Sequence, residues 1–209
     1  MTPRAVGLLA ALGVLVVGGL GVLFVKRGEL LGAAGGSQPP LAPGERVLLL
    51  GDSIGVGTAQ HLADELAAAG ATLDAEPHVG WTAKKVRTAL DADPSLVGDV
   101  VVISLGSNDW AMMDPTSEAD DVHAIVATAR ARGARRVLWV IGPNYGIDNP
   151  PAPATMTKQV AFATMVADQD VELVVPNAEV VSQLGPDRIH LPPRGYAALA
   201  RQIASVLTA

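Results

Sequence analysis

The sequence predicts a three-layer α/β/α sandwich built on a parallel sheet of about five strands, a number obtained by counting apolar runs. Two observations support this fold class. Short apolar runs, of which residues 47–50 and 99–105 are the clearest, have the length and composition of buried strands. Helical patterns separate these runs, and strands that alternate with helices form a parallel sheet covered on both faces.

The elements follow one another without an internal repeat. Strands are expected at residues 47–50, 99–105, 136–141 and 171–175, and a strand that runs into a loop is expected at residues 71–79. Helices are expected at residues 58–69, 82–90, 117–132, 154–168 and 193–207. Gly55 and Gly57 predict a tight turn before the first helix, because glycine adopts turn conformations readily. Ser117 is a candidate cap for the third helix, and Pro193 suits the first turn of the last one.

The first 27 residues are predicted to form an N-terminal transmembrane anchor. Residues 5–25 contain no charged side chain, and about 20 apolar residues suffice to cross a bilayer as a helix. A cleaved signal peptide is the alternative, but its apolar core is usually shorter, about 7–15 residues. Because the apolar stretch is longer and is followed directly by Lys26 and Arg27, we favour an anchor. The flanking charges are too evenly matched to set its orientation.

Residues 28–44 are rich in glycine, alanine, proline and serine and are predicted to form a flexible tether. The folded domain is then expected to cover residues 45–209. An anchor with a tether is most simply used to hold a domain outside the cytoplasm. We therefore expect an extracytoplasmic location, in the cell envelope or periplasm.

Charge and cysteine content exclude several classes of function. The formal net charge of the 209 residues is −6, and no basic run follows Arg27, so nucleic acid is not an expected partner. The chain contains no cysteine, which excludes disulfides, thiol catalysis and thiolate metal sites. Asp120, Asp121 and His123 suggest a metal site only weakly, since acidic residues at the start of a helix also suit the helix dipole.

A serine follows the first predicted strand, in the segment Gly51-Asp52-Ser53. Ligands collect beyond the carboxyl ends of the strands of an open α/β sheet, and a helix N-terminus favours developing negative charge. Ser53 is therefore a candidate nucleophile. The alternative is that Ser53 only caps the following helix, because serine and aspartate are preferred caps. Asp52 is expected to be structural, since the chemistry does not need it.

Ser53 would need a base and an oxyanion hole to act as a nucleophile. His190 could take the hydroxyl proton, and Asp187, three residues earlier, could hold the histidine in the required tautomer. The backbone N–H groups of Ser53 and Gly80 and the side-chain amide of Asn108 are suitable donors for an oxyanion. The alternative for Asn108 is that of a turn residue, and Asp109 is expected to support its loop.

These segments together resemble the successive blocks of the SGNH (GDSL-type) hydrolase family. The resemblance rests on Gly51-Asp52-Ser53, Gly80, Gly106-Ser107-Asn108-Asp109 and Asp187-x-x-His190, and it covers residues 46–209. It implies that Ser53 is the nucleophile, His190 the base and Asp187 the residue that orients it. It also implies an oxyanion hole made by Ser53, Gly80 and Asn108, within the same three-layer fold.

Two other motifs do not fit the sequence as well. Residues 51–55 fit Gly-x-Ser-x-Gly, the nucleophile elbow of α/β-hydrolases, but only one strand precedes the serine and the acid stands three residues before the histidine. A phosphate-binding loop is excluded, because the glycine spacing after Leu50 is wrong and no Lys-Ser or Lys-Thr follows. The mechanism with Ser53, His190 and Asp187 needs no metal and no organic cofactor.

Two tryptophans lie next to the predicted oxyanion donors in the sequence. Trp81 follows Gly80 and Trp110 follows Asp109, so the two rings could line a sugar or acyl pocket, or they could simply cover the sheet edge. Our first hypothesis is a membrane-anchored serine esterase that cleaves small acyl esters, such as O-acetyl groups on glycans. The alternative is a tethered glycan- or lipid-binding module that keeps the fold without turnover.

Overall fold

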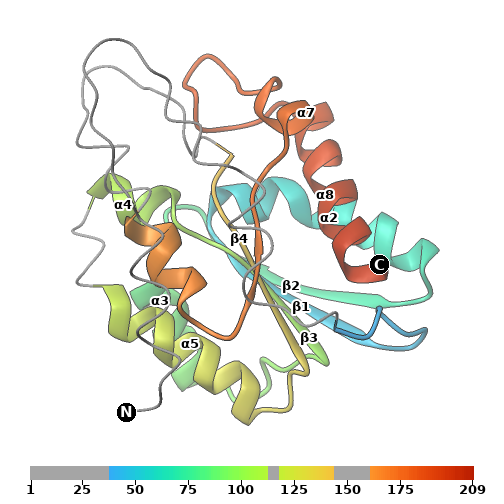
Figure 1. Cartoon of the computed structure of the whole chain (residues 1–209), viewed down its shortest axis with the longest axis vertical. Coiled ribbons are helices and arrows are strands. Elements are labelled where there is room, and N and C mark those ends of the chain that lie inside the picture. Colours follow the sequence, from blue (N-terminus) through green and yellow to red (C-terminus); the bar gives the residue numbers. More distant parts are fainter. Residues whose placement is uncertain (1–37, 113–117, 144–160) are drawn as a thin grey trace, which may run out of the picture. The chain divides into compact units, whose positions relative to one another are not determined.

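Five parallel strands form the sheet in the part of the chain that the computed structural model describes, residues 38–112, 118–143 and 161–209 (Figure 1). The side chains of residues 110–112 are outside this description. The strand order is β2-β1-β3-β4-β5, and all neighbouring strands are parallel. The strands are β1 Arg46–Gly51, β2 Thr72–Pro77, β3 Val100–Ser104, β4 Arg136–Val140 and β5 Glu172–Val174.

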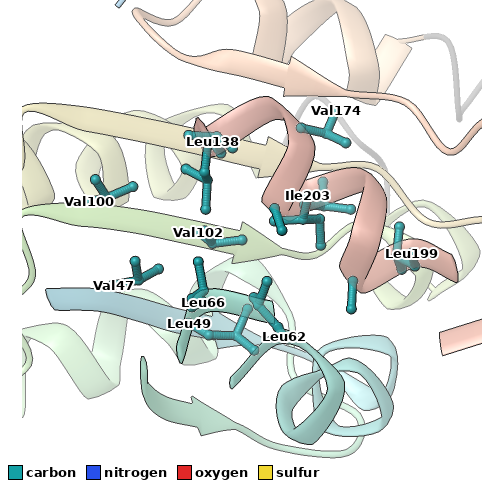
Figure 2. Close-up of a cluster of buried hydrophobic side chains, with 14 of the residues drawn as sticks. Val47, Leu49, Leu62, Leu66, Val100, Val102, Leu138, Val174, Leu199 and Ile203 are labelled. Atoms are coloured by element: carbon teal, nitrogen blue, oxygen red, sulfur yellow. The ribbon is translucent and has the colours of Figure 1, made fainter. Parts of the chain in front are cut away.

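Side chains alternate strictly between the two faces of the central strands, because successive residues of a strand point to opposite sides. In β1, Val47 and Leu49 belong to one apolar cluster and Leu48 and Leu50 to another. The same alternation holds in β3 and β4. Figure 2 shows the first cluster, in which strand side chains pack against the helices on that face. Continuous apolar runs are needed here because both faces of the strands are buried.

Helices cover both faces of the sheet and complete the three layers. The helices α2, Ser53–Ala68, and α8, Pro193–Thr208, contribute to the first apolar cluster. The helices α3, Ala83–Ala92, and α5, Ala119–Ala131, contribute to the second, together with the helical residues 161–167. The short helices are α4, Ser107–Met112, and α7, Ala178–Val181. The predicted three-layer fold with its parallel sheet is confirmed.

The local predictions need several corrections. Helix α2 begins at Ser53, not at Thr58, and Gly55 and Gly57 lie inside it rather than in a turn. Glycine is required at position 57 because a Cβ atom there would lie 2.3 Å from the ring of Tyr196 in α8. The residues that follow Gly106 form α4 rather than a loop, and α7 was not predicted.

Other local predictions fall partly or wholly outside the described residues. Ser117 is one of them, and Glu118 is the N-cap of α5, without a side-chain hydrogen bond of its own to the helix. The same holds for residues 154–160 of the helix expected at residues 154–168.

The predicted anchor at residues 5–25 lies outside the described residues. Among the described residues, the structure contains no helix that is both long and apolar enough to span a bilayer. The predicted tether is described only from residue 38 onward. Leu41 is buried there, and its N–H donates to the carbonyl of Leu207 at 2.7 Å.

An arginine cluster, Arg46, Arg135 and Arg136, lies at the amino end of the sheet. Arg136 is almost fully buried and forms two hydrogen bonds with the carboxylate of Glu172 at 2.7 and 2.8 Å. Its remaining N–H groups donate to three backbone carbonyls, those of residues 39, 206 and 207. The cluster therefore joins the incoming chain, β5 and the end of α8.

Candidate active site

Ser53 stands at the carboxyl edge of the sheet, directly after β1. The connections from β1 and β3 lead to opposite sides of the sheet in the order β2-β1-β3-β4-β5, and such a switch point is where open α/β sheets bind ligands. Ser53 is the first residue of α2, so the helix itself does not use its backbone N–H. The N-cap is Asp52, whose Oδ1 accepts from the N–H of Ile54 at 2.9 Å. The alternative in which Ser53 serves only as the cap is therefore wrong.

Ser53, His190 and Asp187 form one continuous line of hydrogen bonds. The Oγ of Ser53 lies 2.9 Å from Nε2 of His190, and Nδ1 of His190 lies 2.7 Å from Oδ2 of Asp187. If Nδ1 carries the proton and donates to the carboxylate, Nε2 is left to accept the serine proton. The structure thus brings Ser53 to a histidine that lies 137 residues later in the chain.

The turn before α8 fixes the orientation of Asp187. Its Oδ1 accepts from the backbone N–H groups of Ile189 and His190, both at 3.0 Å, which leaves Oδ2 for the imidazole. Arg188 adopts a left-handed conformation with φ of 57°, which is uncommon for a residue with a side chain. The hydrogen bond from His190 and those from the two backbone N–H groups lower the pKa of Asp187 to about 2. The carboxylate therefore stays charged at neutral pH.

The three donors expected in the oxyanion hole follow three neighbouring strand ends. Ser53 follows β1, Gly80 follows β2 and Asn108 follows β3. The Nδ2 of Asn108 donates to the carbonyl of Trp81 at 2.9 Å, which ties the Gly80 turn to α4 and leaves the second N–H of that amide for another acceptor. Gly80 has φ of 74°, so its left-handed backbone, rather than crowding, favours glycine.

Trp81 lies against the core and against His78. The two rings stack with their centroids 4.0 Å apart, and Trp81 is partly buried against the second apolar cluster. The Nε2 of His78 lies 2.8 Å from a carboxylate oxygen of Glu76. Trp81 therefore stands beside the candidate oxyanion hole, whereas the side chain of Trp110 lies outside the described residues.

Three carboxyl groups, Asp52, Asp109 and Glu118, are buried at this end of the sheet and form what we call the acidic cluster. Each has at least one buried oxygen without a hydrogen-bond donor among the described residues. Burial raises the pKa of Asp52 and of Asp109 to about 6 and that of Glu118 to about 7. The sequence did not single out Glu118, because it stands in an acidic stretch that is typical of a helix start.

The described residues contain no group of three or more side chains suited to hold a metal ion. Asp121 instead pairs with Arg87 at 2.8 Å, and Nδ1 of His123 lies 3.1 Å from the side-chain oxygen of Gln169. The weak suggestion of a metal site at the start of α5 therefore has no support in this geometry.

Residues 49–198 match the model of the GDSL-like lipase/acylhydrolase family. The chain belongs to this family. The match runs from β1 into α8 and includes every residue of the candidate site, from Ser53 to His190. Membership confirms the resemblance seen in the sequence and identifies the chain as an ester hydrolase of the GDSL type.

Solved structures of other hydrolases share this fold. LAE5, an α/β hydrolase enzyme from the metagenome of Lake Arreo, is 17% identical with a TM-score of 0.64, covering 83% of this chain and 100% of its own. The psychrotrophic esterase EstA from Pseudoalteromonas sp. is 18% identical with a TM-score of 0.62, over 78% and 96%. Axe2, an acetylxylan esterase from Geobacillus stearothermophilus, is 17% identical with a TM-score of 0.60, over 81% and 97%. No curated protein matched the sequence.

Proposed function

We propose that this GDSL-type hydrolase cleaves small acyl esters with Ser53 as nucleophile, His190 as base and Asp187 as the residue that orients the base. The observation that carries the proposal is the unbroken hydrogen-bonded line from Ser53 Oγ through His190 to Asp187, at 2.9 and 2.7 Å. Two of the solved structures are described as catalytic mutants of Axe2, in which an aspartate and a histidine three residues apart are replaced by alanine. Asp187 and His190 have the same spacing.

The proposed reaction proceeds in two halves. Ser53 Oγ attacks the ester carbonyl carbon while His190 Nε2 takes the hydroxyl proton, and the negative charge moves to the carbonyl oxygen. The intermediate collapses, and the leaving alcohol receives the proton from His190. A water molecule then attacks the acyl-serine, again giving a proton to His190. The products are a carboxylic acid and free Ser53, so one ester and one water become one acid and one alcohol.

The oxyanion is proposed to bind to the backbone N–H groups of Ser53 and Gly80 and to the free amide N–H of Asn108. Support comes from the N-terminal position of Ser53 in α2 and from the bond that fixes Asn108 beside the Gly80 turn. Donors that are already in place need not reorganise when charge develops, which is why such sites lower a barrier strongly.

We propose O-acetyl groups on a glycan as the substrate. The Ser53–His190 end is open, since the side chains of His190 and Asp187 are 47% and 48% exposed, and a polymer can reach such a site. Trp81 lies beside Gly80 and is only partly buried, so a sugar could contact the part of its ring that His78 and the core leave uncovered. Axe2, which shares the fold, is an acetylxylan esterase. These observations favour an acetylated glycan over a long-chain lipid.

The proposal includes a membrane anchor at residues 5–25 and a domain outside the cytoplasm. Leu41 joins the domain beside the end of α8, at the amino end of the sheet, whereas Ser53 lies at the carboxyl end. Six strand residues span about 20 Å, so the site opens far from the point where the tether joins. That arrangement suits a substrate in the envelope better than a lipid of the anchoring membrane. Protease shaving of intact cells should release the domain; a fully protected domain would contradict this location.

The first experiment is hydrolysis of p-nitrophenyl acetate, butyrate and octanoate by the full chain in detergent. We expect turnover that is fastest on acetate and is lost in Ser53→Ala. Ser95→Ala is the matched control, because Ser95 Oγ bonds Asp93 in a loop after α3 and lies outside the site. Stable glycan binding without product by the wild type would instead support the alternative, a binding module without turnover.

Trp81→Ala tests the glycan part of the proposal separately. With an acetylated xylooligosaccharide we expect KM to rise about 10-fold, since stacking of a ring face contributes roughly 1–1.5 kcal/mol. With p-nitrophenyl acetate KM should stay nearly unchanged. An equal effect on both substrates would show that Trp81 supports the fold of the Gly80 turn rather than the sugar.

A further inference from the structure

Asp109 of α4 accepts a hydrogen bond from the first residue of another helix, α3. Its Oδ1 accepts from the N–H of Ala83, the first residue of α3, at 2.7 Å. The N-cap of α3 is Thr82, which makes no side-chain hydrogen bond to the helix. Asp109, which belongs to α4, therefore caps the N-terminus of α3. Its neighbour Asn108 holds the carbonyl of Trp81, so two adjacent residues of α4 fix the segment that follows Gly80.

Glu118 is a neighbour of Asp109 in the acidic cluster. The side chains of Asp109 and Glu118 lie close enough to interact with each other, and both residues are fully buried. No donor among the described residues reaches Oδ2 of Asp109 or either carboxylate oxygen of Glu118. Two ionised carboxylates can only accept hydrogen bonds. The contact is therefore favourable only if one of the two groups carries a proton.

The surroundings decide which group holds that proton. Asp52, at the start of α2, faces Asp109, while Asp121 of α5 and Lys84 of α3 face Glu118. Burial, with a smaller contribution from nearby negative charge, raises the pKa of Glu118 to about 7 and that of Asp109 to about 6. Asp109 also receives the N–H of Ala83, which favours its charged form. Glu118 is thus the donor and Asp109 the acceptor.

We propose that Glu118 and Asp109 share one proton and act as positioning residues for the oxyanion hole. Glu118 donates to Asp109, Asp109 holds the N–H of Ala83, and Asn108 holds the carbonyl of Trp81. This chain of contacts keeps the Gly80 N–H and the Asn108 amide in the geometry that binds the oxyanion. The inference rests on the proposed function of the site, but neither residue touches the substrate.

Loss of the shared proton should therefore lower kcat. When Glu118 ionises, two buried negative charges face each other without a donor, and their repulsion moves α4 relative to the start of α3. A displacement of about 1 Å in such a site can cost roughly 100-fold in rate. Ground-state binding of a small ester uses few of these contacts, so KM should change little.

The test is the pH dependence of kcat in the full-length protein and in Glu118→Gln. Glutamine has the same shape and carries a donor at every pH, so it replaces the protonated acid. We expect kcat of the wild type on p-nitrophenyl acetate to fall at least 10-fold between pH 6.5 and 9 (a range set around the raised pKa of Glu118). In Glu118→Gln, kcat should stay within about twofold over that range, with KM unchanged in both proteins.

Two further variants serve as the control and as the test of donor removal. Glu179→Gln is the matched control, because Glu179 is an exposed partner of Arg201 outside the site, and it should keep the wild-type pH profile. Glu118→Ala removes the donor altogether and should lower kcat about 10-fold to 100-fold at pH 6.5 as well. Superposable pH profiles of the wild type and Glu118→Gln would overturn the inference, even if thermal stability changed. Retained activity in Ser53→Ala would instead overturn the proposed function.

Discussion

The two ends of the sheet differ in how their charged side chains are paired. At the amino end, each member of the arginine cluster has a carboxylate partner: Arg46 pairs with Asp74, Arg135 with Glu45 and Arg136 with Glu172. At the carboxyl end, the acidic cluster has buried oxygens for which the described residues provide no donor. A buried charge that has lost its partner is costly to the fold, whereas a paired one avoids that cost. The contrast indicates that the amino end holds the domain together and the carboxyl end is shaped for chemistry.

The largest effect should come from the catalytic line at the carboxyl end. Ser53→Ala and His190→Ala are each expected to lower kcat roughly 10⁵-fold to 10⁶-fold, because residues that act as one unit lose nearly everything when one member is removed. The double variant should be no slower than the single variants. Steady-state kinetics and thermal unfolding should show lost turnover without lost stability. Additive losses in the double variant would mean that the two residues do not act together.

The next largest effect should come from the amino end of the sheet. There, a substitution should lower stability and leave activity nearly unchanged. Arg136→Met removes the donor from the carboxylate of Glu172 and from the carbonyl of Val206, and breaking one side of a buried ion pair costs about 3–5 kcal/mol. Denaturant unfolding should show this loss, while kcat below the unfolding transition stays within about twofold, since that end lies far from Ser53. A large fall in kcat at low temperature would disprove the division of roles between the two ends.

Arg201→Met is the control for that variant. Arg201 pairs with Glu179 at 2.9 Å on the surface, with both side chains more than half exposed. Such a pair contributes about 0–1 kcal/mol, so this substitution should change the free energy of unfolding far less than Arg136→Met does.

Asn108→Ala should reduce catalysis by a smaller amount than loss of the nucleophile. Removal of one oxyanion donor costs about 100-fold to 1,000-fold in kcat, and KM should change little. Asn177→Ala offers a matched comparison, because Asn177 caps α7 through a bond to the N–H of Val180 at 3.1 Å. It should cost about 1 kcal/mol of stability without loss of kcat. Equal kcat in Asn108→Ala and wild type would remove Asn108 from the oxyanion hole.

The parts of this fold that depend on local pattern could be predicted from the sequence. The runs that became β1 and β3 are apolar on both faces, and the order of Ser53, Gly80, Asn108 and His190 along the chain placed each beside the carboxyl edge. Parallel strands bring those segments to one edge whatever the details of packing. This is why the candidate site was predicted more completely than the boundaries of its elements.

Tertiary packing decides what the sequence could not predict. Gly55 and Gly57 have the composition of a turn, yet they lie inside α2, where the absence of a side chain lets the helix approach Pro77 and Tyr196 closely. Glu118 has the composition of an exposed helix start, yet it is buried against Asp109. Neither fact is visible in periodicity or in a motif, since each depends on a residue distant in the chain.

The smallest effect should follow from neutralising Asp52. Burial raises the pKa of Asp52 from its ordinary value of 3.8 to about 6, so the folded protein binds this proton more tightly than the unfolded chain. The stability that Asp52 contributes is therefore complete below about pH 4 and is lost as the pH rises toward and through about 6.

Asp52→Asn removes this pH-dependent loss of stability, and asparagine is as good an N-cap as aspartate. We expect the variant to be more stable than the wild type by about 1–3 kcal/mol at pH 8 and equally stable at pH 4. Asp64→Asn, which removes an exposed carboxylate of the same helix, should change neither value. A variant that is less stable than the wild type at pH 8 would show that the charge of Asp52 is compensated, and the contrast between the two ends of the sheet would then rest on Asp109 and Glu118 alone.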